Sequence, residues 1–358
     1  MQIFFPSRRD DWILLLATLA LAGGGLFHLW TVTGPAETYY FSRQIIWVVI
    51  GIGIMFFLSF LRISFWRKGA YFFYGIIFFC LLLVLAKGEG AYGAQRWLKI
   101  GIIGFQPSEF AKLILIIVLA RLLTSKEKIN TKQIVLSFCF TFIFLILVAG
   151  QPDLGSALIF LPLWLVMLFL AGVSLRGILT ILGIGLLLLP ISYFFLHPYQ
   201  RMRILTFLNP GRDPLGAGWN ILQSKIALGS GRLIGKGLGG AVRTQLRFLP
   251  RPFTDFVFAT VGEEWGFIGI LLLLGFYLII VLKGIKIARE KNNNFAKLVS
   301  AGIVVLLFLQ VFINIGMAIG IMPVIGMPLP LISYGGSSTI MFFMVIGILF
   351  SISRFEDR

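Results

Sequence analysis

The chain has 358 residues, of which 58% are hydrophobic and only 13% are charged, and its formal net charge is +17. Soluble proteins are about one quarter charged, so this composition excludes an ordinary soluble domain and indicates an integral membrane protein. The positive charge does not require a nucleic-acid partner, because basic residues that flank membrane helices and face anionic lipids account for it.

Ten apolar segments are long enough to be membrane-spanning helices, each of which needs about 20 mostly apolar residues. In chain order they cover residues 12–30, 43–61, 69–86, 107–124, 133–149, 154–172, 177–196, 264–283, 298–320 and 331–352. A β-barrel is not expected, since barrel strands alternate apolar and polar residues and these segments do not. The sequence therefore predicts an all-α polytopic membrane protein with ten transmembrane helices. It forms one integral membrane domain, residues 1–358, with a long loop at 197–255.

The connections between these segments differ in their content of basic residues. If the N-terminus is cytoplasmic, the inner connections and termini hold 17 Lys and Arg residues and the short outer connections hold four. Because cytoplasmic loops carry an excess of basic residues, we expect a protein of the cytoplasmic (inner) membrane with both termini in the cytoplasm. The loop at 197–255 is then extracytoplasmic.

The fourth and sixth segments begin with similar polar motifs at the outer face. "QPSEFAK" places Pro107 in the first turn, ahead of Glu109 and Lys112, and "QPDLG" places Pro152 before Asp153. A structural interpretation is available, because proline and acids both suit a helix start and Glu109 can pair with Lys112 one turn later. The functional interpretation is that ionisable groups at membrane depth line a cavity or a pathway.

The long loop contains turn signals and a short helical pattern. Ile221, Lys225 and Leu228 have the spacing of an amphipathic helix that could lie in the membrane interface.

The eighth segment is entered through "RPFTDFVFATVGEEWGF", which carries Asp255, Glu263 and Glu264. Asp255 resembles Glu109 and Asp153 in lying where the chain enters the membrane from outside, so we expect one polar cavity that opens outward. For Glu263 and Glu264 a structural or topological role is favoured. Glu109, Asp153 and Asp255 are not spaced as a local metal-ligand set, but their oxygens could recruit Mg²⁺ or Mn²⁺ together with a phosphate.

The stretch "GIMPVIGMPLPLISYGGSS", residues 320–338, is apolar but interrupted by three prolines. Irregular backbone at membrane depth is tolerated where it is buried in protein or lines a cavity. The alternative is an ordinary proline-rich loop, and the sequence does not decide between the two.

Together, "QPSEFAK", "QPDLGSA", "PYQRMRILTFLNPGRDPLGAGWNILQSKIALGSG", "TDFVFATVGEEWGF" and "PLPLISYGGSS" resemble the SEDS family (shape, elongation, division and sporulation). The resemblance runs through nearly the whole chain and is greater to the elongation branch than to the division branch. It implies ten transmembrane helices and the polymerisation of lipid II into peptidoglycan glycan strands at the outer face. It also implies a class B penicillin-binding protein as the crosslinking partner.

The family's essential acid corresponds to Asp255, and its cavity positions correspond to Glu109, Lys112 and Asp153. One departure is "PRPFTDF", where many relatives have "PERHTDF", so Arg251 replaces an acid and Phe253 a polar residue.

This resemblance suggests an inverting glycosyl transfer. Asp255 is the candidate general base that activates the 4-hydroxyl of an acceptor N-acetylglucosamine for attack on C1 of the donor N-acetylmuramic acid. The leaving group is undecaprenyl pyrophosphate, an anion that cations can stabilise. The candidate cations are Lys112 and four residues of the outer loop: Arg201, Arg203, Lys225 and Lys236.

Two alternatives belong to other functional classes. A lipid II flippase would need a path to both membrane faces, whereas the candidate ionisable groups all lie toward the outer leaflet. A scaffold for the transpeptidase would not need a polar cavity. The sequence therefore favours outer-face chemistry.

Overall fold

The structure is a computed structural model. It describes residues 9–33, 37–88, 96–100, 103–125, 129–151, 153–194, 201–202, 205–207, 209, 216–240, 248–249 and 252–355. The helices are α1 (Arg9–Val32), α2 (Thr38–Ser59), α3 (Ile63–Lys87), α4 (Pro107–Leu123), α5 (Thr131–Ala149), α6 (Leu154–Leu170), α7 (Leu175–Phe194), α9 (Ala217–Ser230), α11 (Val257–Glu290), α12 (Asn294–Ala318) and α13 (Gly336–Arg354). A short antiparallel hairpin, β1 (Leu98–Ile100) and β2 (Ile103–Phe105), precedes α4.

Each apolar segment predicted from the sequence overlaps one of these helices, but the tenth was predicted from residue 331 whereas α13 begins at Gly336. Within the described ranges, seven helices are long and apolar enough to cross a membrane: α1, α2, α3, α5, α11, α12 and α13. The helices α4 and α6 are shorter, with 17 residues each. The protein is therefore a mostly helical membrane protein, and the number of ten crossings stays a prediction.

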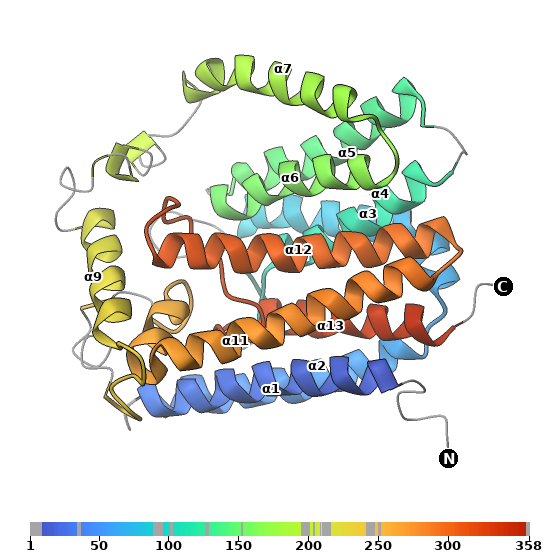
Figure 1. Ribbon diagram of the computed structural model, residues 1–358. Helices are drawn as coiled ribbons and strands as arrows, with labels where there is room; N and C mark the ends of the chain where they lie inside the picture. The colour runs from blue at the N-terminus through green and yellow to red at the C-terminus, as the bar shows by residue number, and fades with distance from the viewer. Residues whose placement is uncertain are drawn as a thin grey trace.

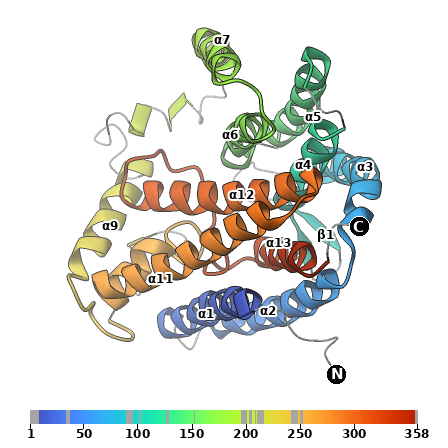
Figure 2. The same ribbon diagram turned by 45° about the vertical axis from the view of Figure 1, so that its right-hand side comes forward.

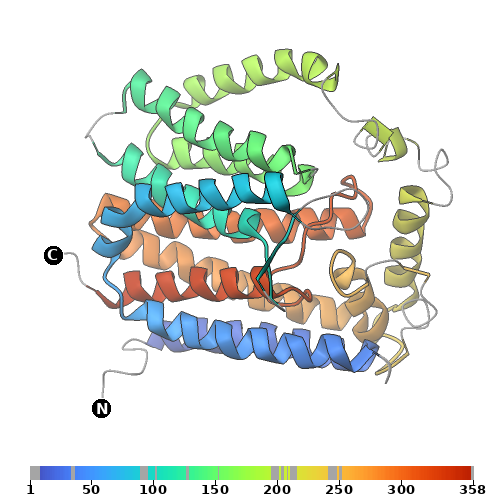
Figure 3. The same ribbon diagram turned by 180° about the vertical axis from the view of Figure 1, so that it is seen from behind.

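The bundle helices lie side by side, and α1 begins at the same end of the bundle at which α13 ends (Figure 1). The opposite end carries α9, which lies across the direction of the other helices, and the connection between α12 and α13 (Figures 1 and 3). The helices α4, α6 and α11 begin toward this second end (Figure 1). We call it the loop end of the molecule.

The most buried helix is α4, which packs against α3, α5, α6, α12 and α13 (Figure 2). Every side chain from Ala111 to Ala120 is buried, including Lys112. A helix that is apolar on all sides belongs in the interior of a bundle, where neighbouring helices cover each face. The "QPSEFAK" motif is therefore held at the centre of the molecule rather than at its edge.

The structure has a helix, α9, at the place predicted in the long loop. Its buried residues include Ile221 and Ala227 but also Gln223 and Ser224, whereas Leu222 and Lys225 are exposed. Its placement in the membrane interface stays a prediction.

The predicted start of the eighth segment, at residue 264, was wrong. The helix begins at Val257 and contains a break at Gly266, whose φ of 67° and ψ of −166° are not helical. Positive φ favours glycine, which has no Cβ to clash. The first part of α11 is thus a short half-helix, which the apolar pattern alone did not separate from the preceding loop.

Backbone groups freed by this break are bonded by segment 231–240, which consists of turns. Phe267 N donates to Arg232 O at 2.9 Å and Ile268 N to Leu233 O at 3.1 Å. In the other direction, Lys236 N donates to the carbonyl oxygen of Glu263 at 3.0 Å. Segment 231–240 therefore supplies bonds that a continuous helix would have made internally.

Candidate active site

Asp255 lies in a turn over residues 252–256, directly before α11. The residue is 9% exposed, and its Oδ2 lies beside Gly326, where an added Cβ would be 3.4 Å away. Gly326 has a φ of 76°, which favours glycine. The α12–α13 connection, residues 319–335, therefore passes next to the candidate base.

Glu109 and Lys112 form the predicted ion pair in the first part of α4. Lys112 Nζ donates to Glu109 Oε1 at 2.7 Å, and the two residues are 0% and 1% exposed. The second carboxylate oxygen of Glu109, Oε2, is buried and has no hydrogen-bond partner among the described residues. Buried polar atoms are usually bonded, so this oxygen is an acceptor suited to a ligand or a water molecule.

Asp153 is the N-cap of α6. Its Oδ1 accepts a hydrogen bond from Ser156 N at 3.3 Å and lies 3.5 Å from Nη1 of Arg96. Its Oδ2 is buried, and within the described part of the chain no partner bonds it. The capping role confirms the structural interpretation of "QPDLG". Arg96 is a neighbour that sequence spacing did not indicate.

The α12–α13 connection lies against the start of α6 and the turn that precedes α11. Gly155, in the first turn of α6, packs so closely against Ile325 that an added Cβ would clash with the carbonyl oxygen of Ile325. The residue after Ile325 is Gly326, which lies beside Asp255. Just beyond the connection, Ser337 in the first turn of α13 accepts a hydrogen bond through Oγ from Gln106 N, the N-cap of α4, at 3.0 Å. The connection therefore contacts both the turn of Asp255 and the first turn of α6, while a single polar cavity lined by Glu109, Lys112, Asp153 and Asp255 stays a prediction.

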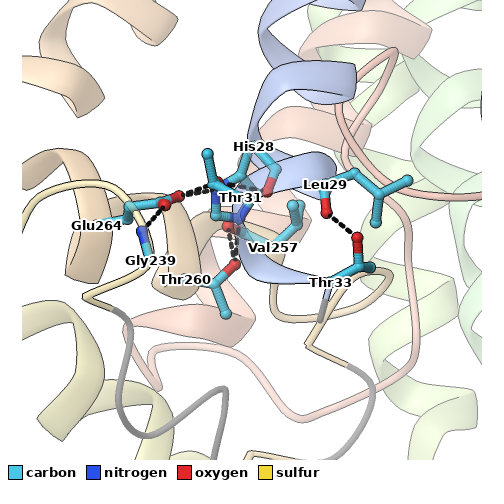
Figure 4. Close-up of polar contacts among 8 residues, drawn as sticks. All are labelled: His28, Leu29, Thr31, Thr33, Gly239, Val257, Thr260 and Glu264. Atoms are coloured by element: carbon cyan, nitrogen blue, oxygen red, sulfur yellow. Dashed lines mark hydrogen bonds and ion pairs between the residues drawn. The ribbon is translucent and has the colours of Figure 1, made fainter. Parts of the chain in front are cut away.

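Glu264 belongs to a different polar cluster, between α1 and α11 (Figure 4). Its Oε2 lies 2.7 Å from His28 Nδ1 and accepts from Thr31 Oγ1 at 2.8 Å, while Oε1 accepts from Gly239 N at 2.9 Å. His28 Nε2 lies 2.8 Å from Thr260 Oγ1. Glu264 therefore joins α1, α11 and segment 231–240. The sequence offered only a lone histidine in the first apolar segment as a signal for this cluster.

Lys236, a predicted pyrophosphate-binding cation, is paired with Glu263. Lys236 Nζ lies 2.6 Å from Glu263 Oε1, and the glutamate is fully buried. This pair adds to the backbone bonds between segment 231–240 and α11.

The other candidate cations of the long loop have different surroundings. Lys225 is exposed on α9, next to the α12–α13 connection: an added Cβ on Gly320 would lie 2.8 Å from its Nζ. Arg201 donates from Nη2 to Phe194 O at 2.7 Å. Arg203 lies outside the described residues.

A metal centre built only from protein side chains is not supported in the part of the chain that the structure describes. No group of three or more His, Cys, Asp or Glu side chains there could hold a metal ion. Glu109, Asp153 and Asp255 therefore do not form such a group. A cation shared with phosphate oxygens stays a prediction.

Comparison with known proteins gives consistent matches over the full chain. A family model described as "Cell cycle protein", for FtsW, RodA and SpoVE, matches residues 13–358. The chain is 40% identical to the peptidoglycan glycosyltransferase MrdB of Escherichia coli K12, over 98% of this chain and 95% of that protein. Among solved structures, a peptidoglycan synthase complex that coordinates polymerisation and crosslinking contains a chain that is 32% identical, with a TM-score of 0.83, 96% coverage of this chain and 97% of that one. The rod shape-determining protein RodA of Thermus thermophilus is 29% identical, with a TM-score of 0.73 and 96% coverage of both chains.

Proposed function

The chain belongs to the FtsW/RodA/SpoVE family of SEDS proteins, and we infer that it is a peptidoglycan glycosyltransferase that polymerises lipid II into glycan strands. The full-length similarity to a peptidoglycan glycosyltransferase and to RodA supports the elongation branch rather than the division branch. The observation that supports this chemistry best is that Asp255 and the first turn of α6, which Asp153 caps, both lie against residues 325–326 of the α12–α13 connection.

In this reaction Asp255 is the general base. Its carboxylate takes the proton of the acceptor 4-hydroxyl as the new bond forms between that oxygen and C1 of the donor sugar. The bond from C1 to the pyrophosphate oxygen breaks, and the electron pair leaves with undecaprenyl pyrophosphate. Placement of Asp255 in a turn before α11, with the residue 9% exposed, supports this role because the side chain belongs to a turn outside the regular helices.

Positive charge stabilises the departing pyrophosphate in this proposal. Lys112 has no acidic contact among the described residues other than Glu109, and that glutamate keeps one oxygen for hydrogen bonding to substrate. Lys225 is an exposed cation beside the α12–α13 connection and is well placed to meet a lipid-linked phosphate. Lys236 is a weaker candidate, because Glu263 already neutralises it. A divalent cation would be held by one or two of the carboxylates together with pyrophosphate oxygens.

The protein acts, in this proposal, at the outer face of the cytoplasmic membrane with both termini in the cytoplasm. The excess of basic residues on one side supports this orientation. The partner is a class B penicillin-binding protein, and the similarity to a chain from a synthase complex that couples polymerisation to crosslinking supports this assignment.

The test is lipid II polymerisation by the purified chain with its class B partner, comparing wild type with Asp255→Asn. We expect glycan strands from the wild type and none above background from the variant, with both complexes intact by size-exclusion chromatography. Equal polymerisation by Asp255→Asn would remove Asp255 as the base. Absence of polymer from a folded, lipid II-loaded wild-type complex would instead favour the flippase alternative.

A further inference from the structure

Three consecutive carbonyl oxygens in the turn that carries Asp255 accept hydrogen bonds from other parts of the chain. Phe253 O accepts from Tyr334 N at 2.8 Å, and Thr254 O accepts from Ser333 Oγ at 2.6 Å. The third, the carbonyl oxygen of Asp255 itself, accepts from Asn314 Nδ2 at 3.0 Å. Hydrogen bonds therefore fix the backbone of this turn at three consecutive residues, the last of which is Asp255.

Asn314 is the side chain that ties this turn to the α12–α13 connection. Its Nδ2 also donates to Met327 O at 2.7 Å, so both amide hydrogens are used. Both partners are carbonyl oxygens, which only accept, and therefore the nitrogen rather than the oxygen of the amide must face them. Asn314 is fully buried on α12.

The α12–α13 connection is itself held in place at this point. Ser333 Oγ accepts from Leu329 N at 2.8 Å while it donates to the Asp255 turn. The hydroxyl of Tyr277, on α11, donates to the carbonyl oxygen of Pro330. A non-helical segment at membrane depth needs such partners for its backbone groups, so the turn and the connection form one bonded unit.

We propose that Asn314 is a positioning residue for Asp255, acting through the backbone of the catalytic turn and assisted by Ser333. The proposal rests on the proposed role of Asp255 as the base. Asn314 is buried beneath the turn and acts through the carbonyl group of Asp255 rather than through its carboxylate. Misplacement of a reacting group by about 1 Å can cost roughly 10²-fold in rate, so losing this bond should slow the chemical step.

Gln310 provides a matched control on the same helix. It lies one turn before Asn314, is also fully buried, and its amide contacts the sulfur of Met327 at 3.5 Å. Within the described part of the chain, the structure shows no hydrogen bond between Gln310 and the Asp255 turn. Replacing Gln310 removes a buried amide of similar environment while leaving the three carbonyl bonds in place.

The experiment compares Asn314→Leu, Gln310→Leu and wild type, each in complex with the class B partner. We expect Asn314→Leu to lower kcat for lipid II polymerisation about tenfold or more, with KM for lipid II within twofold of wild type. Gln310→Leu should keep kcat within about threefold of wild type at a comparable melting temperature.

Two results would overturn the proposal. One is an Asn314→Leu kcat within twofold of wild type, and the other is an equal loss of kcat in Gln310→Leu. If Asn314→Leu does not assemble with the partner, the same kinetics are measured for Ser333→Ala. A lower kcat at unchanged KM then supports positioning through the turn, and an unchanged kcat contradicts the proposal. Asp255→Asn is assayed in parallel to test the role of Asp255 as the base separately. An active Asp255→Asn variant would disprove that role, whereas the comparison of Asn314→Leu with Gln310→Leu tests the positioning role of Asn314.

Discussion

Lys112 and Glu109 form a buried pair of opposite charges, with 2.7 Å between Nζ and Oε1. Removing one partner leaves the other as an unpaired buried charge, which costs about 3–5 kcal/mol, whereas replacing both with apolar groups is often neutral. We therefore expect Lys112→Met to melt well below wild type and Lys112→Met/Glu109→Met to recover most of the loss. If Lys112 also stabilises the leaving group, the double variant will be stable but unable to polymerise lipid II.

A second buried lysine supplies the control for this comparison. Lys291, at the end opposite the loop end, is 6% exposed and donates to Phe355 O at 2.8 Å. Lys291→Met should lower the melting temperature while leaving polymerisation by the folded fraction unchanged. A double Lys112/Glu109 variant with wild-type polymerisation would show that the pair is only structural.

At the scale of elements, the break in α11 depends on a glycine. Gly266 has a φ of 67°, and an added Cβ would clash with the backbone nitrogen of Gly235 in segment 231–240. We expect Gly266→Ala to lower the stability of the protein by at least about 1–3 kcal/mol, because it strains the backbone and displaces the segment that bonds the break. Thermal unfolding of the purified protein, followed by intrinsic fluorescence, measures the effect.

Gly275, nine residues further along α11, is the matched control. An added Cβ there meets nothing within 4 Å, so Gly275→Ala should be neutral or stabilising by up to roughly 1 kcal/mol. Similar melting temperatures for the two alanine variants would argue against a conformational requirement at Gly266.

For the whole molecule, the charge distribution predicts which end faces outward. In a background with Cys80→Ala and Cys139→Ala, a cysteine at Ile234, which is 80% exposed in segment 231–240, should react with a membrane-impermeant maleimide in intact spheroplasts. A cysteine at Asn292, between α11 and α12, should react only after permeabilisation. The opposite pattern would reverse the orientation, and with it the face at which the acids lie.

Helices were the most predictable feature of the sequence, because each depends on the apolar content of one continuous segment. Each of the ten predicted segments overlaps a helix, although the last was predicted from residue 331 and α13 begins at Gly336. The proline-rich stretch does interrupt the chain between α12 and α13. The start of α11 was less predictable. The half-helix before Gly266 is stabilised by bonds from segment 231–240, and such partners leave no local periodicity in the sequence.

The site was predictable only in part. Glu109, Lys112, Asp153 and Asp255 are noticeable because ionisable groups are rare in apolar segments. Asn314 and His28 were missed, since a single amide or imidazole in an apolar helix gives no indication of its partner. Their partners Asp255 and Glu264 lie 59 and 236 residues away along the chain.

The sequence by itself determined that this is a helical membrane protein with acidic helix starts on one side, since apolar length, proline and charge act locally. Family membership could also be read from its motifs. Only the tertiary structure decided that Asn314 and Ser333 hold the turn of Asp255, and that Glu263 and Glu264 secure segment 231–240 instead of joining the other acids. The physical reason is that a buried hydrogen bond depends on which distant segments the packing of the helices brings within about 3 Å.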